Sequence, residues 1–394
     1  PQYADQWGLS QINAPGAWDE TTGSSDVVIA VIDSGLDTSH PDLAGRLWTN
    51  PGEIAGNGID DDNNGHLDDM HGWNIVDDDA NLSDNTGHGT QVAGVIGAET
   101  DNGEGIAGVC GNCRLMVVKV TQPGGVANYS DIAAGVAYAA QKGAEVINLS
   151  LGGYADSSTL RTAIQEAAET AVVVGGAGND DKSDCFYPAA YDNVLAVSGT
   201  TGSDAKVGTS NYGTWVDVSA PGETIRTTFD GGGYGDISGT SMAVPFVSGL
   251  AGLLKSQHAD WAPGLLQAHI VHTTDNIDSA NPGYKGQLGS GRINANAAVG
   301  TDASPQISVQ SHTVDGEDQR PEPGSTFELA VSLRNEWGPA SGLAGTLSTS
   351  DSYATVDDGS GTFGDIPSGD TGDNRADTFQ VTLDTNTPYA HPVL

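Results

Sequence analysis

The stretch VVIAVIDSGLDTSHPDL (27–43) begins with an uninterrupted apolar run at 27–32 and turns polar at Asp33. Branched apolar residues without polar alternation are typical of a strand that is buried on both faces of a parallel sheet. An acidic residue directly after such a strand lies at its carboxyl end, where α/β sheets carry their chemistry. The stretch therefore predicts a doubly covered parallel sheet, with Asp33 at its functional edge.

Strand-like and helix-like segments alternate along the chain up to residue 300. Further apolar runs lie at 114–120, 144–152, 170–179 and 193–200. Helical patterns lie between them at 89–98, 130–143 and 159–170. Strands that alternate with helices fold into a parallel sheet with helices on both sides. We therefore predict an α/β three-layer domain at 1–300.

The pattern changes near residue 300. Helical periodicity disappears, and Gly, Pro and Asp separate strand-like segments at 305–314, 325–336, 344–350 and 377–385. Short alternating strands with frequent turn residues are typical of an antiparallel β-sandwich. We predict a linker at 301–306 and a β-sandwich accessory domain at 307–394. Because no turn signal precedes residue 394, we expect the chain to be part of a larger protein.

The composition is strongly acidic. The chain carries 52 Asp and Glu against 14 Lys and Arg, which gives a formal net charge of −38. Nucleic acid is excluded as a partner, because phosphate binding needs clustered basic residues. The balance favours solubility, bound cations and a saline environment in which salt screens the self-repulsion. No apolar run approaches the roughly 18 residues that span a bilayer, and no signal peptide is present. We expect a mature or trimmed, monomeric form.

Three cysteines are too few for a disulfide scaffold. Cys110 and Cys113 form a C-G-N-C pair in a predicted loop. Such a pair is compatible with half of a zinc site, a redox motif or a local disulfide. The lack of a second CxxC favours a local disulfide in an oxidising compartment. Cys185 is then free, or exchanges partners with that pair.

Two motifs carry a base and a nucleophile. NTGHGTQVAGVIGA (85–98) places His88 at the start of a helix, where the helix dipole disfavours the imidazolium and keeps the ring ready to accept a proton. ISGTSMAVPFVSGLAGLL (237–254) places Ser241 at the start of a long apolar helix, with Pro245 in the first turn. Taken singly, such residues serve more often as turn or cap residues.

The order Asp33, His88, Ser241 along the chain resembles the subtilisin family of serine proteases. The resemblance rests on D-S-G, H-G-T and G-T-S-M-A in register, and it covers residues 6–300. It implies a secreted serine endopeptidase in which His88 takes the Ser241 proton, Asp33 orients the imidazole and an acyl-enzyme forms. Asn179, after VVVGGAG, stands where the family carries its oxyanion donor.

The serine motif departs from the family pattern in one place. It continues A-V-P-F where the family usually has A-S-P-H or A-T-P-H. We expect altered packing around Val244 and Phe246 and unaffected chemistry. The resemblance also implies an N-terminal propeptide that assists folding and is then cleaved off.

By resemblance, protein or peptide substrates bind as an added β-strand between two segments. The residues assigned to substrate binding are Gly124, Gly125, Val126, Tyr129, Ser150, Leu151, Gly152, Gly175, Gly176, Gly178 and Phe186. The last glycines leave room for the P1 side chain, and Phe186 is expected to shorten its pocket. Tyr129 is expected to line a more distant pocket.

Two acidic segments are predicted to bind Ca²⁺, which takes six to eight oxygen ligands. The segment TDNGEGIAGV (100–109) matches the calcium loop of subtilisins. The ligands that this resemblance implies are Asp42, Thr100, Asn102, Glu104 and Ile106. The family's N-terminal ligand has no clear counterpart here.

The second segment is NGIDDDNNGHLDDMHGWN (57–74), in which Asp60, Asp62 and Asn64 mimic the first half of an EF-hand loop. Its twelfth position is His71 rather than Glu, so it is not a true EF-hand. We expect Asp68 or Asp69 to supply the remaining ligand instead, and His66 is a further candidate ligand. The alternative is a solvated acidic loop without a metal.

The main alternative function is a catalytically silent, calcium-binding adhesion module, which the acidic surface and the β-rich region would suit. The complete catalytic set favours the protease, because a silenced enzyme more often lacks one member. An esterase of the α/β-hydrolase type needs G-x-S-x-G and the order Ser, Asp, His. A zinc peptidase needs H-E-x-x-H. Neither motif is present.

Overall fold

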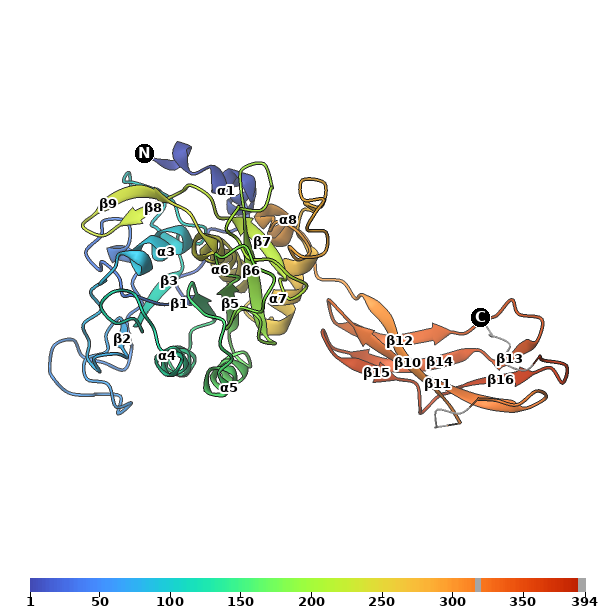
Figure 1. Cartoon of the computed structure of the whole chain (residues 1–394). Coiled ribbons are helices and arrows are strands. Elements are labelled where there is room, and N and C mark those ends of the chain that lie inside the picture. Colours follow the sequence, from blue (N-terminus) through green and yellow to red (C-terminus); the bar gives the residue numbers. More distant parts are fainter. Residues whose placement is uncertain (316–319, 389–394) are drawn as a thin grey trace. The chain divides into compact units, whose positions relative to one another are not determined.

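The computed structural model describes residues 1–315 and 320–388. The chain forms two compact units, Pro1–Thr301 and Asp302–Leu394, and the second is coloured orange to red in Figure 1. Each unit has its own apolar core. The last residues, 389–394, where we expected the chain to be cut from a larger protein, lie outside the described residues.

The first unit is built on a seven-stranded parallel sheet with the order β2-β3-β1-β4-β5-β6-β7. The strands are β1 (Val28–Asp33), β2 (Gly72–Asn74), β3 (Arg114–Lys119), β4 (Val146–Leu149), β5 (Val172–Gly176), β6 (Val194–Thr200) and β7 (Val218–Pro221). Five of these strands fall within the predicted apolar runs. The predicted α/β class is confirmed.

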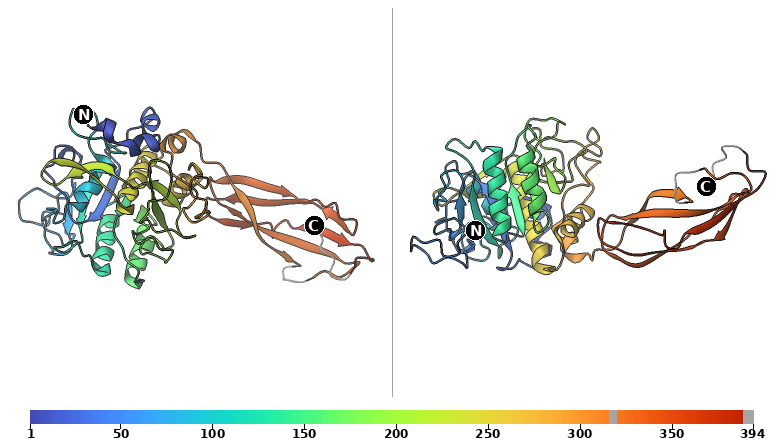
Figure 2. Two further views of the ribbon diagram at one scale, coloured as in Figure 1. Left: turned by 45° about the horizontal axis from the view of Figure 1, so that its top comes forward. Right: turned by 90° about the horizontal axis from the view of Figure 1, so that it is seen from below.

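Helices cover both faces of this sheet (Figures 1 and 2). They are η1 (Tyr3–Asp5), α1 (Trp7–Gln11), α2 (Ala14–Trp18), η2 (Ala44–Arg46), α3 (His88–Gly97), α4 (Tyr129–Gln141), α5 (Ser158–Ala167), α6 (Thr240–Gln257), α7 (Pro263–His272) and α8 (Ala295–Gly300). The core on one face includes α3 and α6, and the core on the other includes α4 and α5. Among the described residues, no helix is long and apolar enough to cross a membrane.

The uninterrupted apolar run of β1 follows from this layering. Ile29 and Val31 pack into the core with α3 and α6, whereas Ala30 and Ile32 pack into the core with α4 and α5. Neighbouring side chains of a strand point to opposite faces. A strand between two helix layers therefore needs apolar residues at consecutive positions.

The sequence patterns missed β2, β7 and a hairpin of β8 (Ile225–Phe229) and β9 (Gly233–Ile237), whose strands pair antiparallel. β2 has only three residues, and β7, with the sequence VSAP, lacks the run of large apolar residues on which the prediction depended. The buried positions of β8 include Thr227 and Thr228, whose hydroxyls donate to backbone carbonyls of α3 at 2.6 Å. A strand that docks through hydroxyl groups lacks the apolar signal on which the prediction depended.

Helix α6 begins at Thr240, so Pro245 lies inside the helix rather than in its first turn. The predicted position of this proline is wrong. Because proline has no backbone N–H, it removes one intrahelical hydrogen bond. Its neighbours Val244 and Phe246 are buried, and the Phe246 ring lies against Gly8 of α1; that their packing differs from the family pattern stays a prediction.

Cys110 and Cys113 are joined by a disulfide bond, and both are fully buried. Cys185 is a free, exposed thiol. The pair lies under Gly23 and Gly252, where an added Cβ would come within 2.3 Å and 3.0 Å of a cysteine sulfur. An exchange of partners with Cys185 would therefore require the surrounding core to open.

The second unit is made of antiparallel strands, as predicted. They are β10 (Ile307–Val314), β11 (Thr326–Asn335), β12 (Ala340–Thr346), β13 (Ala354–Asp358), β14 (Ser360–Ile366), β15 (Thr371–Asp373) and β16 (Phe379–Leu383). One sheet has the order β10-β11-β16-β13 with β15 beside β11, and a second pairs β12 with β14. The small core of this unit is formed by Val314, Phe327, Val381 and Leu383.

Candidate active site

The carboxylate of Asp33 is hydrogen-bonded to the imidazole of His88 at the carboxyl edge of the parallel sheet. Asp33 is the last residue of β1 and is 2% exposed. Its Oδ1 and Oδ2 atoms lie 2.8 Å and 3.0 Å from Nδ1 of His88. A carboxylate in this position binds the tautomer that carries its proton on Nδ1, which leaves Nε2 able to accept a proton.

Glycines let the start of α3 approach the end of β1. Gly87 precedes His88 with a φ of 82°, in the left-handed region that glycine adopts readily. Gly89 follows it, and a Cβ there would come within 2.1 Å of the carbonyl oxygen of Gly35. The H-G-T motif therefore places the histidine ring beside Asp33 by allowing close backbone contact.

A second carboxylate, Asp84, fixes the start of α3, and sequence reasoning missed it. Its Oδ1 accepts hydrogen bonds from Ser34 Oγ at 2.7 Å and from the Gly87 N–H at 2.8 Å. Its Oδ2 accepts from the N–H and the hydroxyl of Thr90 at 2.8 Å and 2.7 Å. Asp84 thus links the residue after Asp33 to the first turn of α3. The sequence feature that could have revealed Asp84 is an acidic residue just before the predicted start of a helix.

Both carboxylates stabilise the protonated form of His88, and their effect outweighs the helix dipole that we expected to disfavour the imidazolium. The charge of Asp33 is the largest cause that raises the pKa of His88 above its ordinary value. Burial acts in the opposite direction, and the charge of Asp84 adds to the increase. The arrangement therefore helps His88 to hold a proton once it has taken one.

The side chains of Ser241 and Asn179 both lie close to Gly239, the residue before α6. Gly239 has a φ of 148°, and a Cβ there would lie 3.2 Å from Ser241 Oγ and 3.5 Å from Asn179 Oδ1. Asn179 Oδ1 accepts the Thr240 N–H at 2.8 Å, which leaves the amide NH₂ as a donor. The N–H of Ser241 lies in the first turn of α6, where amides lack an intrahelical acceptor.

These residues give the edge a base, a hydroxyl and two hydrogen-bond donors. Within the described residues, Ser241 Oγ makes no hydrogen bond of its own. Catalytic hydrogen bonds are often long without substrate and shorten when it binds. The arrangement can activate a serine hydroxyl and stabilise an oxyanion next to it.

The two predicted substrate segments are accessible except at Ser150, which is 7% exposed. Gly124, Gly125 and Val126 are exposed, and both glycines have a positive φ. After β4, Leu151 is half-buried and Gly152 is exposed. Exposed backbone on both sides suits the addition of a peptide strand. The assignment of these residues to substrate stays a prediction.

The ring of Phe186 lies between two of the substrate glycines. A Cβ on Gly152 would come within 2.6 Å of this ring, and one on Gly178 within 3.0 Å. Tyr154, which sequence reasoning missed, packs edge-on against it with ring centroids 5.1 Å apart. Phe186 therefore fills space between the two segments that would hold the P1 side chain.

The other predicted substrate residues, Gly175, Gly176 and Tyr129, lie close to neighbouring parts of the first unit. A Cβ on Gly175 would meet Ala189, and one on Gly176 would meet α6. Tyr129 begins α4, and its hydroxyl would lie 2.6 Å from a Cβ on Gly153. Tyr129 is thus next to the second substrate segment.

A comparison with known proteins identifies the family. The Peptidase_S8 model, described as the subtilase family, matches residues 24–292. The chain belongs to the subtilase family. It is 42% identical over 295 residues to the thermophilic serine proteinase of Bacillus sp. strain AK1, an alignment that covers 75% of this chain and 67% of that protein.

Two other relatives of this subtilase are thermitase and halolysin. Thermitase of Thermoactinomyces vulgaris is 38% identical, with 75% of this chain and 95% of thermitase covered. Halolysin of Haloferax mediterranei is 39% identical, with 77% of this chain and 54% of halolysin covered. Among solved structures, a protease from Pseudoalteromonas arctica matches with a TM-score of 0.66 and 30% identity, over 76% of this chain and 98% of that one. The resemblance to subtilisins is confirmed, and this subtilase is a serine endopeptidase.

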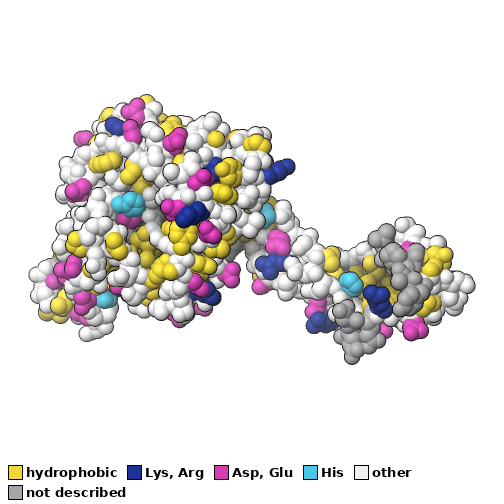
Figure 3. Space-filling model, viewed as in Figure 1, with side chains coloured by type: hydrophobic (Ala, Val, Ile, Leu, Met, Phe, Trp, Pro, Cys, Tyr) yellow, Lys and Arg dark blue, Asp and Glu magenta, His cyan; other side chains and the backbone are white. Residues whose placement is uncertain are grey.

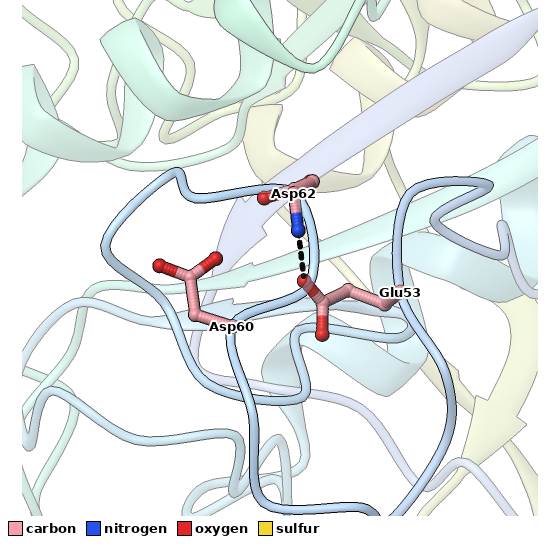
Figure 4. Close-up of side chains that lie close together, drawn as sticks. All are labelled: Glu53, Asp60 and Asp62. Atoms are coloured by element: carbon pink, nitrogen blue, oxygen red, sulfur yellow. Dashed lines mark hydrogen bonds between the residues drawn. The ribbon is translucent and has the colours of Figure 1, made fainter.

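An acidic loop of the subtilase gathers three carboxylates. Oxygens of Glu53, Asp60 and Asp62 lie within 4.8 Å of one another (Figure 4). Glu53 is 8% exposed, and its Oε2 has no hydrogen-bond partner among the described residues. A buried carboxylate oxygen without a partner is unfavourable, and Ca²⁺ takes such oxygens as ligands. The residues present therefore fit Ca²⁺. Glu53 was missed because it precedes the EF-hand-like run.

Asp69, a predicted ligand of the same loop, is satisfied by protein donors. It is fully buried and accepts hydrogen bonds from Asn50 at 2.6 Å, Asn64 at 3.0 Å and the Tyr138 hydroxyl at 2.7 Å. The Lys142 ammonium lies 3.3 Å away. Asp69 thus anchors the loop to α4 and its C-terminal end.

The remaining two predicted ligands differ in their surroundings. The backbone N–H of Asn64 donates to both carboxylates of the EF-hand-like run, at 3.0 Å and 3.1 Å. His66 packs against the rings of Trp73 and Tyr138, with centroids 4.5 Å and 5.3 Å apart. Its Nδ1 is buried without a partner among the described residues.

The other predicted calcium segment surrounds Asp42, which is fully buried. Its oxygens accept hydrogen bonds from the Asn102 amide at 2.8 Å and the Ile106 N–H at 2.9 Å. Thr100 is half-buried and Glu104 exposed in the same loop. In the described part of the chain, no ion pair neutralises Asp42. A buried charge without a counter-ion also fits a cation here.

Acidic side chains are spread over the visible face of the molecule, with few Lys and Arg among them (Figure 3). Among the described residues, the loop with Glu53 brings three carboxylates close enough together to share a cation. The view shows no basic patch on this face that would suit phosphate groups.

Proposed function

We propose that this chain is a secreted, calcium-dependent serine endopeptidase that acts through an acyl-enzyme on Ser241. The observation that carries the proposal is the hydrogen-bonded pair of Asp33 and His88 at the end of β1, on the sheet edge where Asn179 accepts the N–H of Thr240, the neighbour of Ser241. The subtilase match and the proteinase relatives support it.

The first half of the reaction forms the acyl-enzyme. Ser241 Oγ attacks the carbonyl carbon of the scissile peptide bond while Nε2 of His88 takes the hydroxyl proton. Asp33 holds the ring and stabilises the imidazolium. His88 then gives the proton to the amine nitrogen, the C–N bond breaks, and an ester to Ser241 remains.

The second half reverses these roles with water. His88 takes a proton from water, whose oxygen attacks the ester carbon. The proton returns to Ser241 Oγ as the C–O bond breaks, and a carboxylic acid is released. In both halves the attacked carbonyl oxygen becomes negatively charged in a tetrahedral intermediate. This oxygen accepts hydrogen bonds from the Asn179 NH₂ and the Ser241 N–H.

Calcium would be held by oxygens of two loops. Glu53, Asp60 and Asp62 form the first group, and Asp42 with Asn102 belongs to the second. A bound Ca²⁺ would neutralise Glu53 and Asp60 beside the Asp62–Lys142 ion pair, and so it would stabilise the folded chain. Neither group belongs to the catalytic set.

We propose the environment in which the chain acts from its charge and its relatives. A net charge of −38 suits a saline extracellular medium, and a halolysin is among the relatives. The family resemblance supports a cleaved propeptide, and we propose a monomer that acts on proteins or peptides.

Hydrolysis of an unfolded protein substrate tests this proposal. The purified chain should cleave casein, Ser241→Ala should abolish cleavage with unchanged circular dichroism, and Thr214→Ala, at an exposed site, should cleave as the unaltered chain does. Full cleavage by Ser241→Ala would exclude the acyl-enzyme. Excess chelator should lower the melting temperature, and an unchanged melting temperature would exclude the calcium dependence.

A further inference from the structure

The carbonyl oxygen of Ser241 lacks its helical donor. In an α-helix this oxygen accepts the N–H four residues later, and here that residue is Pro245, which has none. The structure supplies a substitute from another element: Ser150 Oγ donates to the Ser241 carbonyl at 2.9 Å. Ser150 is 7% exposed and directly follows β4. A group that Pro245 would leave unpaired is therefore paired across the sheet edge.

Two more buried side chains orient this donor. The Asn148 amide Nδ2 donates to Ser150 Oγ at 3.0 Å, and the Ser248 hydroxyl donates to Asn148 Oδ1 at 2.8 Å. Asn148 and Ser248 are fully buried. A serine hydroxyl has one proton, so accepting from Asn148 directs the Ser150 proton to Ser241. The Ser248 bond likewise turns the NH₂ end of Asn148 towards Ser150.

We propose that Ser248, Asn148 and Ser150 form a positioning relay that replaces the donor lost at Pro245 and holds the backbone of the nucleophile. The inference rests on the proposed role of Ser241. The relay starts in the third turn of α6, passes through β4 and returns to the first turn of α6.

The position of the relay connects it to the chemistry. The residue whose carbonyl it holds also carries the attacking Oγ and an oxyanion N–H. A carbonyl fixed in one direction limits rotation of that residue, and catalytic geometry tolerates little misplacement. Because the relay is buried from water, its hydrogen bonds strengthen one another. Ser248 and Asn148 act only through Ser150, so they are positioning residues.

The sheet contains a matched control for the loss of a buried hydroxyl. Ser198 and Ser219 are fully buried, and their hydroxyls lie 2.7 Å apart on β6 and β7. Neither belongs to the relay or to the proposed catalytic and substrate residues. Ser198→Ala therefore reports the general cost of removing such a group.

The first test compares Ser248→Ala with Ser198→Ala. The readout is the second-order rate of inactivation by diisopropyl fluorophosphate, a small reagent without a peptide backbone to pair with the substrate segments. We expect Ser248→Ala to slow inactivation about 3- to 10-fold, as one lost buried hydrogen bond would, and to lower kcat with little change in KM. Ser198→Ala should react at the rate of the unaltered chain. Equal rates for the two variants would overturn the relay.

The second test uses the proline itself. Pro245→Ala gives position 245 an N–H that can donate to the Ser241 carbonyl. Ser150→Ala should therefore slow inactivation strongly in the Pro245 chain and much less in the Pro245→Ala background. An equal loss in both backgrounds would refute the inference. Should Pro245→Ala fail to fold, the Ser248→Ala comparison decides.

These outcomes separate the inference from the function on which it rests. If the unaltered chain does not react with the reagent, the proposed function fails. If it reacts normally and the substitutions are additive, only the relay is wrong.

Discussion

Nδ1 of His88 faces both carboxylate oxygens of Asp33, at 2.8 Å from Oδ1 and 3.0 Å from Oδ2. Oδ1 of the carboxylate also accepts the Ser34 N–H at 2.7 Å, which helps to fix the carboxylate. This contact joins the end of β1 to the start of α3, so the sheet and the helix together set the orientation of the ring.

The pH dependence of kcat/KM should change when a negative charge near His88 is removed. A base must be neutral to accept a proton, so activity should appear as pH rises through the pKa of His88. Because Asp33 and Asp84 raise that pKa, Asp84→Asn should move the midpoint of kcat/KM to lower pH. Asp78→Asn, at an exposed site, should leave it unchanged. A midpoint that stays constant or rises in Asp84→Asn would contradict the account.

Removal of the proposed oxyanion donor should affect the chemical step. Asn179→Ala leaves the Thr240 N–H without its acceptor and removes the NH₂ donor. We expect kcat to fall by about 10²- to 10³-fold, the usual cost of one such donor, with a small change in KM. Steady-state kinetics on a peptide substrate measures both values. A loss confined to KM would assign Asn179 to substrate binding instead.

Phe186 should limit the size of the P1 side chain. Its ring lies within 2.6 Å of a Cβ position on Gly152 and 3.0 Å of one on Gly178. Phe186→Gly should raise kcat/KM for a substrate with P1 phenylalanine relative to the same peptide with P1 alanine. The ratio of the two values is the measurement. An unchanged ratio would place the pocket elsewhere.

Glu53 should contribute to calcium binding because its buried Oε2 has no protein partner among the described residues. Glu53→Gln should reduce the gain in melting temperature on addition of Ca²⁺ to the chelator-treated chain. Glu20→Gln, at an exposed acid, serves as the control and should keep the full gain. A full gain in Glu53→Gln would exclude Glu53 as a ligand.

Asp217 should destabilise the fold at neutral pH. Burial raises its pKa from 3.8 to about 6, against the opposing hydrogen bond from the Ala196 N–H. Because the carboxyl pKa is raised on folding, the contribution of Asp217 to stability is most favourable below pH 3.8 and is lost as pH rises through about 6. Asp217→Asn should therefore increase the free energy of unfolding by about 3 kcal/mol at pH 7 and far less at pH 4.

Denaturant unfolding at both pH values, with Ca²⁺ held constant, measures this effect. Asp192→Asn, at an exposed acid, is the control and should change stability little at either pH. A lower stability of Asp217→Asn at pH 7 would show that the carboxylate has a stabilising partner.

The parts of the fold that could be predicted from the sequence are those whose burial produces a regular pattern of apolar residues. β1 lies between two helix layers, so its burial appears as consecutive apolar residues. The β8–β9 hairpin escaped prediction because threonine hydroxyls bind it to α3. A buried polar contact of this kind has no periodic signature.

The same distinction applies to the site. Asp33, His88 and Ser241 stand in motifs at element ends, so the motifs and their order together indicated the roles that we propose. Asp84 acts through a contact with Ser34 that forms only when distant segments meet, and Glu53 joins Asp60 and Asp62 only when its loop folds back on itself. The position of Pro245 inside α6 depended on where the helix begins, which sequence patterns define poorly.

The most direct test of the central claim is the site of covalent modification. The chain is treated with a fluorophosphonate and digested, and the modified residue is located by mass spectrometry. The account predicts one adduct on Ser241, formed in the unaltered chain and absent from Ser241→Ala. An adduct on another residue, or a folded and Ca²⁺-loaded chain that forms none, would contradict it.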